Sequence, residues 1–158
     1  MTEALSRRLK QPTFVSPAQE ALLSVMVAAT TLNELMDRVC AEHKITRPQY
    51  NVLRILRGIY PEGHARCDIA CRMIDRAPDV TRLLDRLEAR KLVKRARGRE
   101  DQRQTVTYIT AKGIRLLETM RPRAEAALTA LLGRLSDNDC HELSRLCALI
   151  FDQEGTSN

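Results

Sequence analysis

The chain has 158 residues, of which 29% are charged and 44% are apolar, a composition typical of one water-soluble globular domain. No stretch approaches the roughly eighteen apolar residues of a membrane span, and the amino terminus lacks the apolar core of a signal peptide. Five cysteines without framework spacing argue against a secreted disulfide scaffold. We therefore expect a single domain, residues 1–158, in the cytoplasm and with reduced thiols.

The net charge of +6 is concentrated in one quarter of the chain. The segment from Arg66 to Arg103 contains twelve Lys or Arg against seven Asp or Glu, whereas the remainder is almost neutral. A localised positive field favours a polyanion, such as nucleic acid or an anionic membrane surface. The alternative for any such charge run is a solvated face without a partner.

Two helices are predicted before the basic segment. The motif "SPAQ" at 16–19 combines a capping box with a proline at the first helical position, so a long helix should begin there. Apolar residues lie all round this helix from Ala21 to Cys40, which is typical of burial on more than one side and suggests a partner subunit. A second helix should begin at Thr46 or Arg47 and end in the breakers of "GIYPEG".

The basic segment opens with two short helical patterns separated by "DRAP". The first pattern places on one face Ile69, Ala70 and Met73. The second has apolar residues at i, i+3, i+4 and i+7, namely Val80, Leu83, Leu84 and Leu87. Its opposite face and flanks carry Pro78, Asp79, Thr81, Arg82, Asp85 and Arg86. This arrangement is typical of a helix-turn-helix whose second helix enters the major groove of DNA.

A two-stranded hairpin should follow the second short helix. The chain is predicted to be a strand from about Val93 to Ala96, to turn near Gly98 and to return as a strand over 105–109. A hairpin in this place is a wing, and its loop is rich in arginine, the side chain best suited to a narrow minor groove. Asp101 can bond the guanidinium of Arg103 and hold it extended.

Two more helices are predicted after the hairpin. Thr110 should cap a long helix that Pro122 kinks, and Ser136 should begin the last one. The last helix is predicted to have an inward stripe of Leu143, Leu146, Cys147, Ile150 and Phe151. These helices hold more apolar surface than a small reading head can cover, and a symmetric dimer would bury it.

The segments "VTRLLDRLEARKLVKR", "DQR" and "ITAKG" resemble the MarR family of winged helix-turn-helix regulators, and the element order is similar over 16–151. The resemblance implies a mainly α fold with a DNA-reading region at 46–110, a two-stranded wing, and long terminal dimerisation helices at 16–45 and 111–154. It also implies a homodimer on a pseudo-palindromic operator in double-stranded DNA, and a repressor released by a small molecule rather than an activator. The residues expected at DNA are Arg66, Pro78, Asp79, Thr81, Arg82, Arg86, Arg97, Arg99, Asp101 and Arg103.

The start of the recognition helix departs from the family pattern. Pro78 and Asp79 stand where small hydroxyl residues are common in the family. Asp79 would repel phosphate but could accept a hydrogen bond from a cytosine amine. Asp85 lies within reach of Arg82 and could hold its guanidinium back from DNA, which favours a mixed base and phosphate role for Arg82.

Family effectors, often small aromatic or anionic compounds, bind between the dimerisation helices and the reading head. The corresponding region here contains Met36, Cys40, His43 and Tyr50. A thiol-based redox-sensing regulator of the same fold remains an alternative.

Other classes of function receive less support. We expect no cofactor and no metal, because neither Cys40 with His43 nor "HARC" with Cys71 supplies four ligands at a recognised spacing. An enzyme is not expected, since the six glycines form no phosphate-binding loop and no nucleophile motif is present. A basic dimeric module that binds membranes or acidic proteins remains an alternative, because charge alone does not choose its polyanion. The sequence lacks the basic amphipathic helix that membrane binding would need, and we expect no membrane partner.

Overall fold

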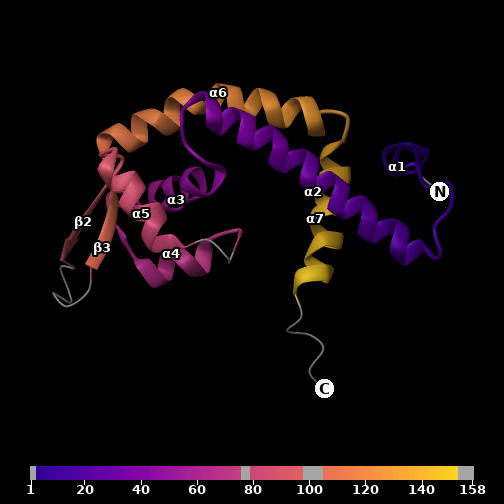
Figure 1. Ribbon diagram of the computed structural model, residues 1–158, viewed down its shortest axis with the longest axis horizontal. Coiled ribbons are helices and arrows are strands. Elements are labelled where there is room, and N and C mark those ends of the chain that lie inside the picture. Colours follow the sequence, from indigo (N-terminus) through magenta and orange to yellow (C-terminus); the bar gives the residue numbers. More distant parts are fainter. Residues whose placement is uncertain (1–2, 76–78, 98–104, 153–158) are drawn as a thin grey trace, which may run out of the picture.

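The computed structural model describes residues 3–75, 79–97 and 105–152. Its elements are α1 (Glu3–Leu9), α2 (Pro17–Glu42), α3 (Arg47–Gly58), β1 (His64–Ala65), α4 (Arg66–Arg72), α5 (Val80–Ala89), β2 (Val93–Arg97), β3 (Thr105–Ile109), α6 (Ala111–Leu132) and α7 (Asp137–Phe151). The long helices α2 and α6 lie side by side, and α3, α4, α5 and the strands gather beneath one end of this pair (Figure 1). The predicted mainly α, winged arrangement is confirmed.

Side-chain caps fix where the long helices begin. The hydroxyl of Ser16 accepts a hydrogen bond from the amide of Gln19 at 3.2 Å, as the motif predicts. The Gln19 side chain accepts from the amide of Val15 at 2.7 Å, so the reciprocal bond is one residue earlier than in a regular capping box. At α3 the box is complete between Thr46 and Gln49.

One apolar core joins the small helices to α6. Its fully buried side chains include Val52, Leu53, Leu56, Ile69, Leu84, Leu87, Leu92 and Met120. Burying each leucine stabilises the fold by about 1.5–3 kcal/mol relative to exposure. The predicted stripe of α5 is confirmed, because Val80, Leu83, Leu84 and Leu87 are all buried.

The sheet is antiparallel with the order β1-β3-β2. Strands β2 and β3 pair from Val93 opposite Ile109 to Arg97 opposite Thr105, which gives the predicted hairpin. The two-residue strand β1 adds a third strand that sequence patterning did not predict, since two residues carry no alternation. Thr107 and Ile109 face the core at 1% and 3% exposure, and Val106 and Tyr108 lie half-buried on the other face.

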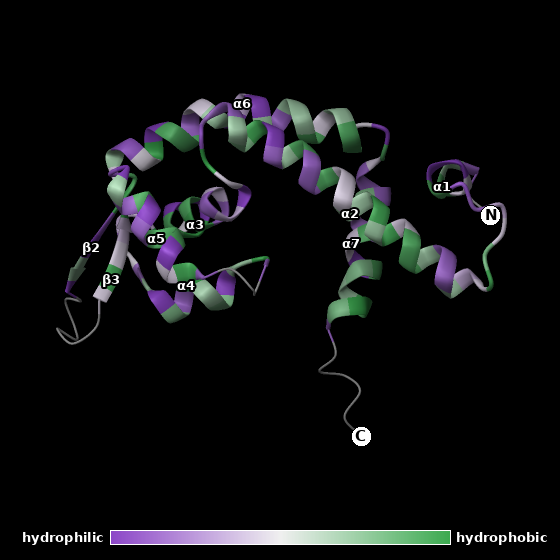
Figure 2. Ribbon diagram, in the orientation of Figure 1, coloured by the Kyte–Doolittle hydropathy of each residue, from purple (hydrophilic) through white to green (hydrophobic). Residues whose placement is uncertain are grey.

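The last two helices differ from expectation in one respect. Helix α6 continues through Pro122 without ending, and its ribbon is curved in Figure 1. The inward stripe predicted for α7 is wrong for the single chain, because no residue of α7 is buried. Its exposed apolar side chains include Leu143, Leu146, Leu149, Ile150 and Phe151, and Figure 2 shows the hydrophobic colour along this helix.

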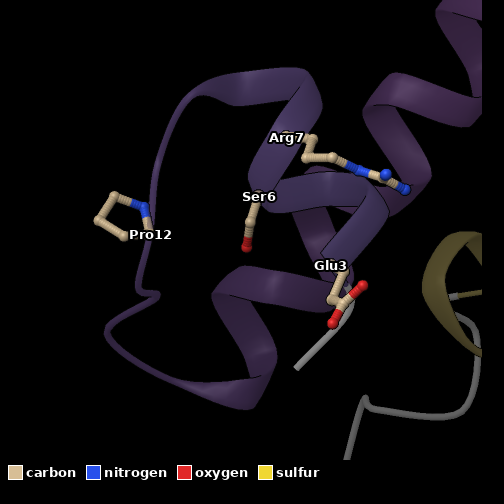
Figure 3. A pocket seen from close by; sticks show the side chains of 4 residues that line it. All are labelled: Glu3, Ser6, Arg7 and Pro12. Carbon is tan, nitrogen blue, oxygen red and sulfur yellow. The ribbon is translucent and has the colours of Figure 1, made fainter.

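The short helix α1 was not predicted. A hollow of about 310 Å³ lies beside it, lined by Glu3, Ser6, Arg7 and Pro12 (Figure 3). Among the described residues, no helix combines the length and the apolar character needed to cross a bilayer.

Candidate nucleic-acid interface

Helix α5 presents a polar face outward because its apolar stripe is committed to the core. Asp79 caps the helix, and its carboxylate accepts from the amide of Arg82 at 3.2 Å. Thr81, Arg82, Asp85 and Arg86 are exposed. With α4 packed beside it, α5 has the exposed surface that a recognition helix requires.

Arg82 pairs with Asp79 and not with Asp85. The Nε atom of Arg82 lies 3.2 Å from Oδ2 of Asp79, and both side chains are more than half exposed. The expectation that Asp85 restrains Arg82 is therefore wrong, because Asp85 has another partner. Asp79 is occupied as a helix cap and an ion-pair partner, which leaves its carboxylate less available to a cytosine amine than we expected.

Asp85 pairs instead with Arg95 on β2. The Nη2 atom of Arg95 lies 2.6 Å from Oδ1 of Asp85, and the Nε atom of Arg95 lies 2.8 Å from Oε2 of Glu88. The side-chain hydrogen bonds from Arg95 are the main reason that the pKa of Glu88 is lowered, and the same bonds raise the pKa of Arg95. Arg95 thus joins the wing to α5 and does not add a free cation to the surface.

Sequence reasoning missed this contact and counted Arg95 only as part of the basic segment. A signal was present, since Asp85 and Glu88 are three residues apart on α5 and an arginine follows on the next strand. The separation between Glu88 and Arg95 is only seven residues, so the contact is local in the chain.

The structure describes only some of the other residues predicted to contact DNA. Arg66 at the start of α4, Arg86 on α5 and Arg97 at the end of β2 are exposed. None of these three has an ion-pair partner within 4.0 Å among residues 3–75, 79–97 and 105–152. The other predicted residues lie outside the described residues, namely Pro78, Arg99, Asp101 and Arg103.

A hydrogen-bonded joint connects the end of α5 to the end of α2. The guanidinium of Arg90 donates to the carbonyl oxygens of Lys44 and His43, the latter at 3.3 Å. The Nζ atom of Lys112 donates to the carbonyl of Arg90 at 2.9 Å, which brings α6 into the same joint. The orientation of the recognition helix is thereby fixed relative to both long helices.

A cavity of about 600 Å³ lies between α2, α3 and α6. Of the four residues expected to bind an effector, Met36 and Tyr50 line it. Cys40 is fully buried in the core, and His43 ends α2 with its carbonyl bonded to Arg90. Charged residues missed by the sequence analysis also line the cavity, namely Arg54, Arg57, Glu118, Arg121 and Glu125.

In the described part of the chain, the cysteines and possible metal ligands form neither a reactive thiol at Cys40 nor a metal site. Burial, with the nearby charge of Asp37, raises the pKa of the Cys40 thiol to about 11, so this thiol stays protonated at neutral pH. Cys67 and Cys71 are exposed on α4. Over the described residues, no group of three or more His, Cys, Asp or Glu side chains is arranged to hold a metal ion.

A helix with an exposed polar face that carries arginines, packed on a shorter helix and followed by an antiparallel hairpin, defines a winged helix-turn-helix DNA-binding protein. Residues 34–120 match the family model described as transcriptional regulator SarA/Rot, which covers more than half of the chain. The chain belongs to the MarR/SarA family of winged helix-turn-helix transcriptional regulators, which are not enzymes.

Individual relatives agree with this assignment. The HTH-type transcriptional regulator TtmR of Methylorubrum extorquens is 38% identical over 90 residues, 57% of this chain and 45% of TtmR, so less than half of that relative is matched. A MarR transcription factor from Planctomyces limnophilus is 36% identical over 87% of this chain and 99% of its own, with a TM-score of 0.66. BpsR of Bordetella bronchiseptica is 25% identical over 90% of this chain and 99% of its own, with a TM-score of 0.74.

Proposed function

We propose that the protein is a homodimeric, sequence-specific repressor that binds a pseudo-palindromic operator in double-stranded DNA and is released by a small molecule. The observation that carries the DNA-binding part is the set of exposed arginines Arg66, Arg86 and Arg97, which have no ion-pair partner among the described residues. Guanidinium groups that no described carboxylate neutralises, on a recognition helix, its neighbour and its wing, are suited to phosphates and base edges.

In this proposal α5 enters the major groove and the β2–β3 wing reaches the minor groove. Thr81, Arg82 and Arg86 face base edges and phosphates from α5, with Asp79 and Pro78 at its start. Arg97, Arg99 and Arg103 act from the wing, and Asp101 braces Arg103. We place the protein in the cytoplasm, where a DNA-binding regulator would meet its operator.

Exposed apolar side chains support the homodimer. Leu22 and Met26 on α2 and Leu128 on α6 are each more than half exposed, as are several side chains of α7. An apolar surface of this extent is unusual for a monomer in water. A two-fold partner that covers these helices would place two recognition helices on successive major grooves, about 34 Å apart.

The cavity between α2, α3 and α6 supports an effector site. Its volume of about 600 Å³ suits a small molecule, and it lies between the long helices and the reading head. The structure of BpsR concerns regulation of its DNA binding by 6-hydroxynicotinic acid. We assign Met36 and Tyr50 to the effector wall, with Cys40 and His43 behind it, and a bound effector would shift the joint at Arg90 and so weaken DNA binding. The protonated, buried Cys40 thiol disfavours the redox alternative at that position.

Fluorescence anisotropy with duplexes from the upstream region of the protein's own gene tests the DNA-binding proposal. The double variant Arg86→Ala/Arg97→Ala should weaken binding by roughly tenfold or more, because it removes two cations from the proposed interface. The matched control Arg115→Ala/Arg134→Ala removes the same charge from exposed positions on and after α6. Equal losses in both variants would show that only net charge matters and would contradict the proposed interface.

A further inference from the structure

A third hollow lies on the outer side of the wing, away from α5. Its volume is about 480 Å³, and residues that line it include Tyr60, Pro61, Lys94, Arg97, Tyr108 and Ala111. Lys94 is opposite Tyr108 in the β2–β3 register, so the two side chains share the sheet face that Arg95 does not use. We call this hollow the wing groove. Among the described residues, it shares no lining residue with the cavity between α2, α3 and α6.

The wing groove concentrates aromatic rings in a chain that has few. The sequence contains only three Tyr, two Phe and no Trp, and two of these five rings line the groove. Each ring already has a cation above it. The guanidinium carbon of Arg57 is 5.6 Å from the Tyr60 ring centroid, and Nζ of Lys94 is 5.8 Å from that of Tyr108. The rings therefore offer flat apolar surfaces with positive charge beside them.

The charged residues that line the wing groove in the described part of the chain have one sign. Lys94 and Arg97 are exposed, and none of the described residues that line the groove is Asp or Glu. Neither cation has an ion-pair partner among residues 3–75, 79–97 and 105–152. The cavity between α2, α3 and α6 differs in this respect, since Glu118 and Glu125 offset its arginines. An anionic group fits the wing groove better than a neutral one.

Close packing holds the loop that carries Tyr60 against the sheet. A Cβ atom added at Gly63 would lie 2.5 Å from the carbonyl oxygen of Thr107 and 2.9 Å from the ring of Tyr108. Glu62 also donates from its amide to the carbonyl of Ile59 at 2.8 Å, which closes a turn. The groove is thus built before any ligand arrives, which lowers the entropic cost of binding.

We propose that the wing groove binds a small planar aromatic anion, with the ring between Tyr60 and Tyr108 and the anionic group on Lys94 and Arg97. The volume of the groove is within the range of small-molecule sites. This site goes beyond the proposed function, because it is separate from the effector cavity. An occupant would engage Arg97, which the proposed function assigns to DNA, so ligand and operator would weaken each other's binding.

Binding of two probes to the full-length protein without DNA tests the proposal. Benzoate and adenosine 5′-monophosphate carry a ring with a carboxylate or a phosphate, and they distinguish an aromatic acid from a nucleotide. Inorganic phosphate and benzyl alcohol supply the anion or the ring alone. Calorimetry and tyrosine fluorescence should show at least one probe binding about tenfold more tightly than either partial compound. Equal affinity for a probe and its partial compounds would overturn the proposal.

Variants locate the bound probe. Lys94→Gln should weaken probe binding by about fivefold, because it removes one exposed charge contact. Arg134→Gln, which removes a distant exposed charge, should leave it unchanged. If Arg54→Gln weakened binding and Lys94→Gln did not, the probe would lie in the cavity between α2, α3 and α6, and the proposal would be wrong. Because DNA is absent from these measurements, failure here leaves the proposed repressor function untouched.

Discussion

A single carboxylate, that of Glu88 on α5, accepts hydrogen bonds from both the backbone and the side chain of Arg95 on β2. The amide of Arg95 lies 3.0 Å from Oε1 of Glu88, and its Nε lies 2.8 Å from Oε2. Since a bidentate contact restrains direction as well as distance, the wing and the recognition helix keep one relative orientation. Both DNA-reading elements of the proposed function are therefore positioned by this pair.

Glu88→Gln should lower the free energy of unfolding at pH 7 by about 0.5–1 kcal/mol, a value discounted for solvent screening because the Glu88 side chain is 38% exposed. Arg95 lowers the pKa of Glu88 in the folded state below its ordinary value of 4.5. The stabilisation is hence complete above the unfolded pKa and is lost as the pH falls through the folded pKa. Urea unfolding at pH 7 and pH 3 should show the difference between wild type and variant shrink at low pH.

Glu118→Gln is a suitable control for this measurement, because Glu118 is exposed on α6 and pairs with no cation within 4.0 Å among the described residues. A Glu88→Gln effect of the same size at both pH values would contradict the charge-assisted contact.

Gly113→Ala should destabilise the fold by about 1–3 kcal/mol, as over-packing does. A Cβ atom at Gly113 would meet the carbonyl oxygen of Leu92 and would lie 2.8 Å from Cγ1 of Ile109. Gly58→Ala is the matched control, since nothing lies within 4 Å of an added Cβ there. It should be neutral or stabilising by about 0.5 kcal/mol through helix propensity. Thermal unfolding of both variants decides the matter, and equal effects would contradict the close approach at Gly113.

Much of this fold could be predicted from periodicity and capping. The apolar stripe of α5 follows a 3.6-residue repeat, and the starts of α2, α3, α6 and α7 carry capping side chains. The helix α1 and the strand β1 could not, because seven and two residues are too short to show a period. Sequence spacing also does not show why the last residue of "ITAKG", Gly113, is a glycine. The structure gives the reason, because a Cβ atom there would collide with the carbonyl oxygen of Leu92.

The candidate site was less predictable than the fold. The sequence lists the cations but does not show which of them already pair with a carboxylate. Only the contacts of Arg95 with α5 in the structure distinguish this paired arginine from the exposed Arg97. In the same way, the apolar residues of α7 indicate a buried face but not whether their own chain or a second copy covers it. Charges brought to one cavity from α3 and α6, such as Arg54 and Glu118, depend on long-range packing that no local pattern encodes.

Operator binding should weaken steeply with salt, because the proposed arginine contacts to phosphates release condensed counterions. Contacts to about six to ten phosphates would lower affinity by roughly 10³ to 10⁵ between 50 and 200 mM salt. Anisotropy titrations over this range measure the slope. A flat response would exclude a phosphate-dominated interface.

The exposed apolar side chains of α2, α6 and α7 should make the protein a dimer at micromolar concentration. Light scattering should give about twice the chain mass of 17.9 kDa. Leu146→Asp/Ile150→Asp should shift the protein toward monomer, because a dimer would have to bury both carboxylates. A monomer that still bound a full operator would rule out the proposed symmetric arrangement.

Arg82→Ala and Arg103→Ala should weaken operator binding in different ways. The pair between Arg82 and Asp79 is exposed and worth about 0–1 kcal/mol, whereas a bidentate contact with guanine is worth about 1–3 kcal/mol, so DNA should displace Asp79. Arg82→Ala should then lose discrimination at one base pair. Arg103→Ala should weaken binding to many duplexes by a similar factor and reduce preference for A·T-rich flanks.

Binding isotherms on single-base-substituted duplexes separate these two patterns, and Asp101→Ala should resemble a milder Arg103→Ala. Tight binding of every duplex by Arg103→Ala would mean that the wing is only a solvated hairpin.

The joint between Arg90 and the end of α2 has an evolutionary consequence. Its acceptors are the main-chain carbonyls of His43 and Lys44, which every amino acid supplies. Position 43 can therefore change its side chain without loss of the joint, and position 44 needs only a residue that tolerates its φ of 56°. Selection on this contact is confined to position 90, where a long side chain with two or more donors is required. Sequence drift at the end of α2 can thus proceed while the recognition helix keeps its orientation.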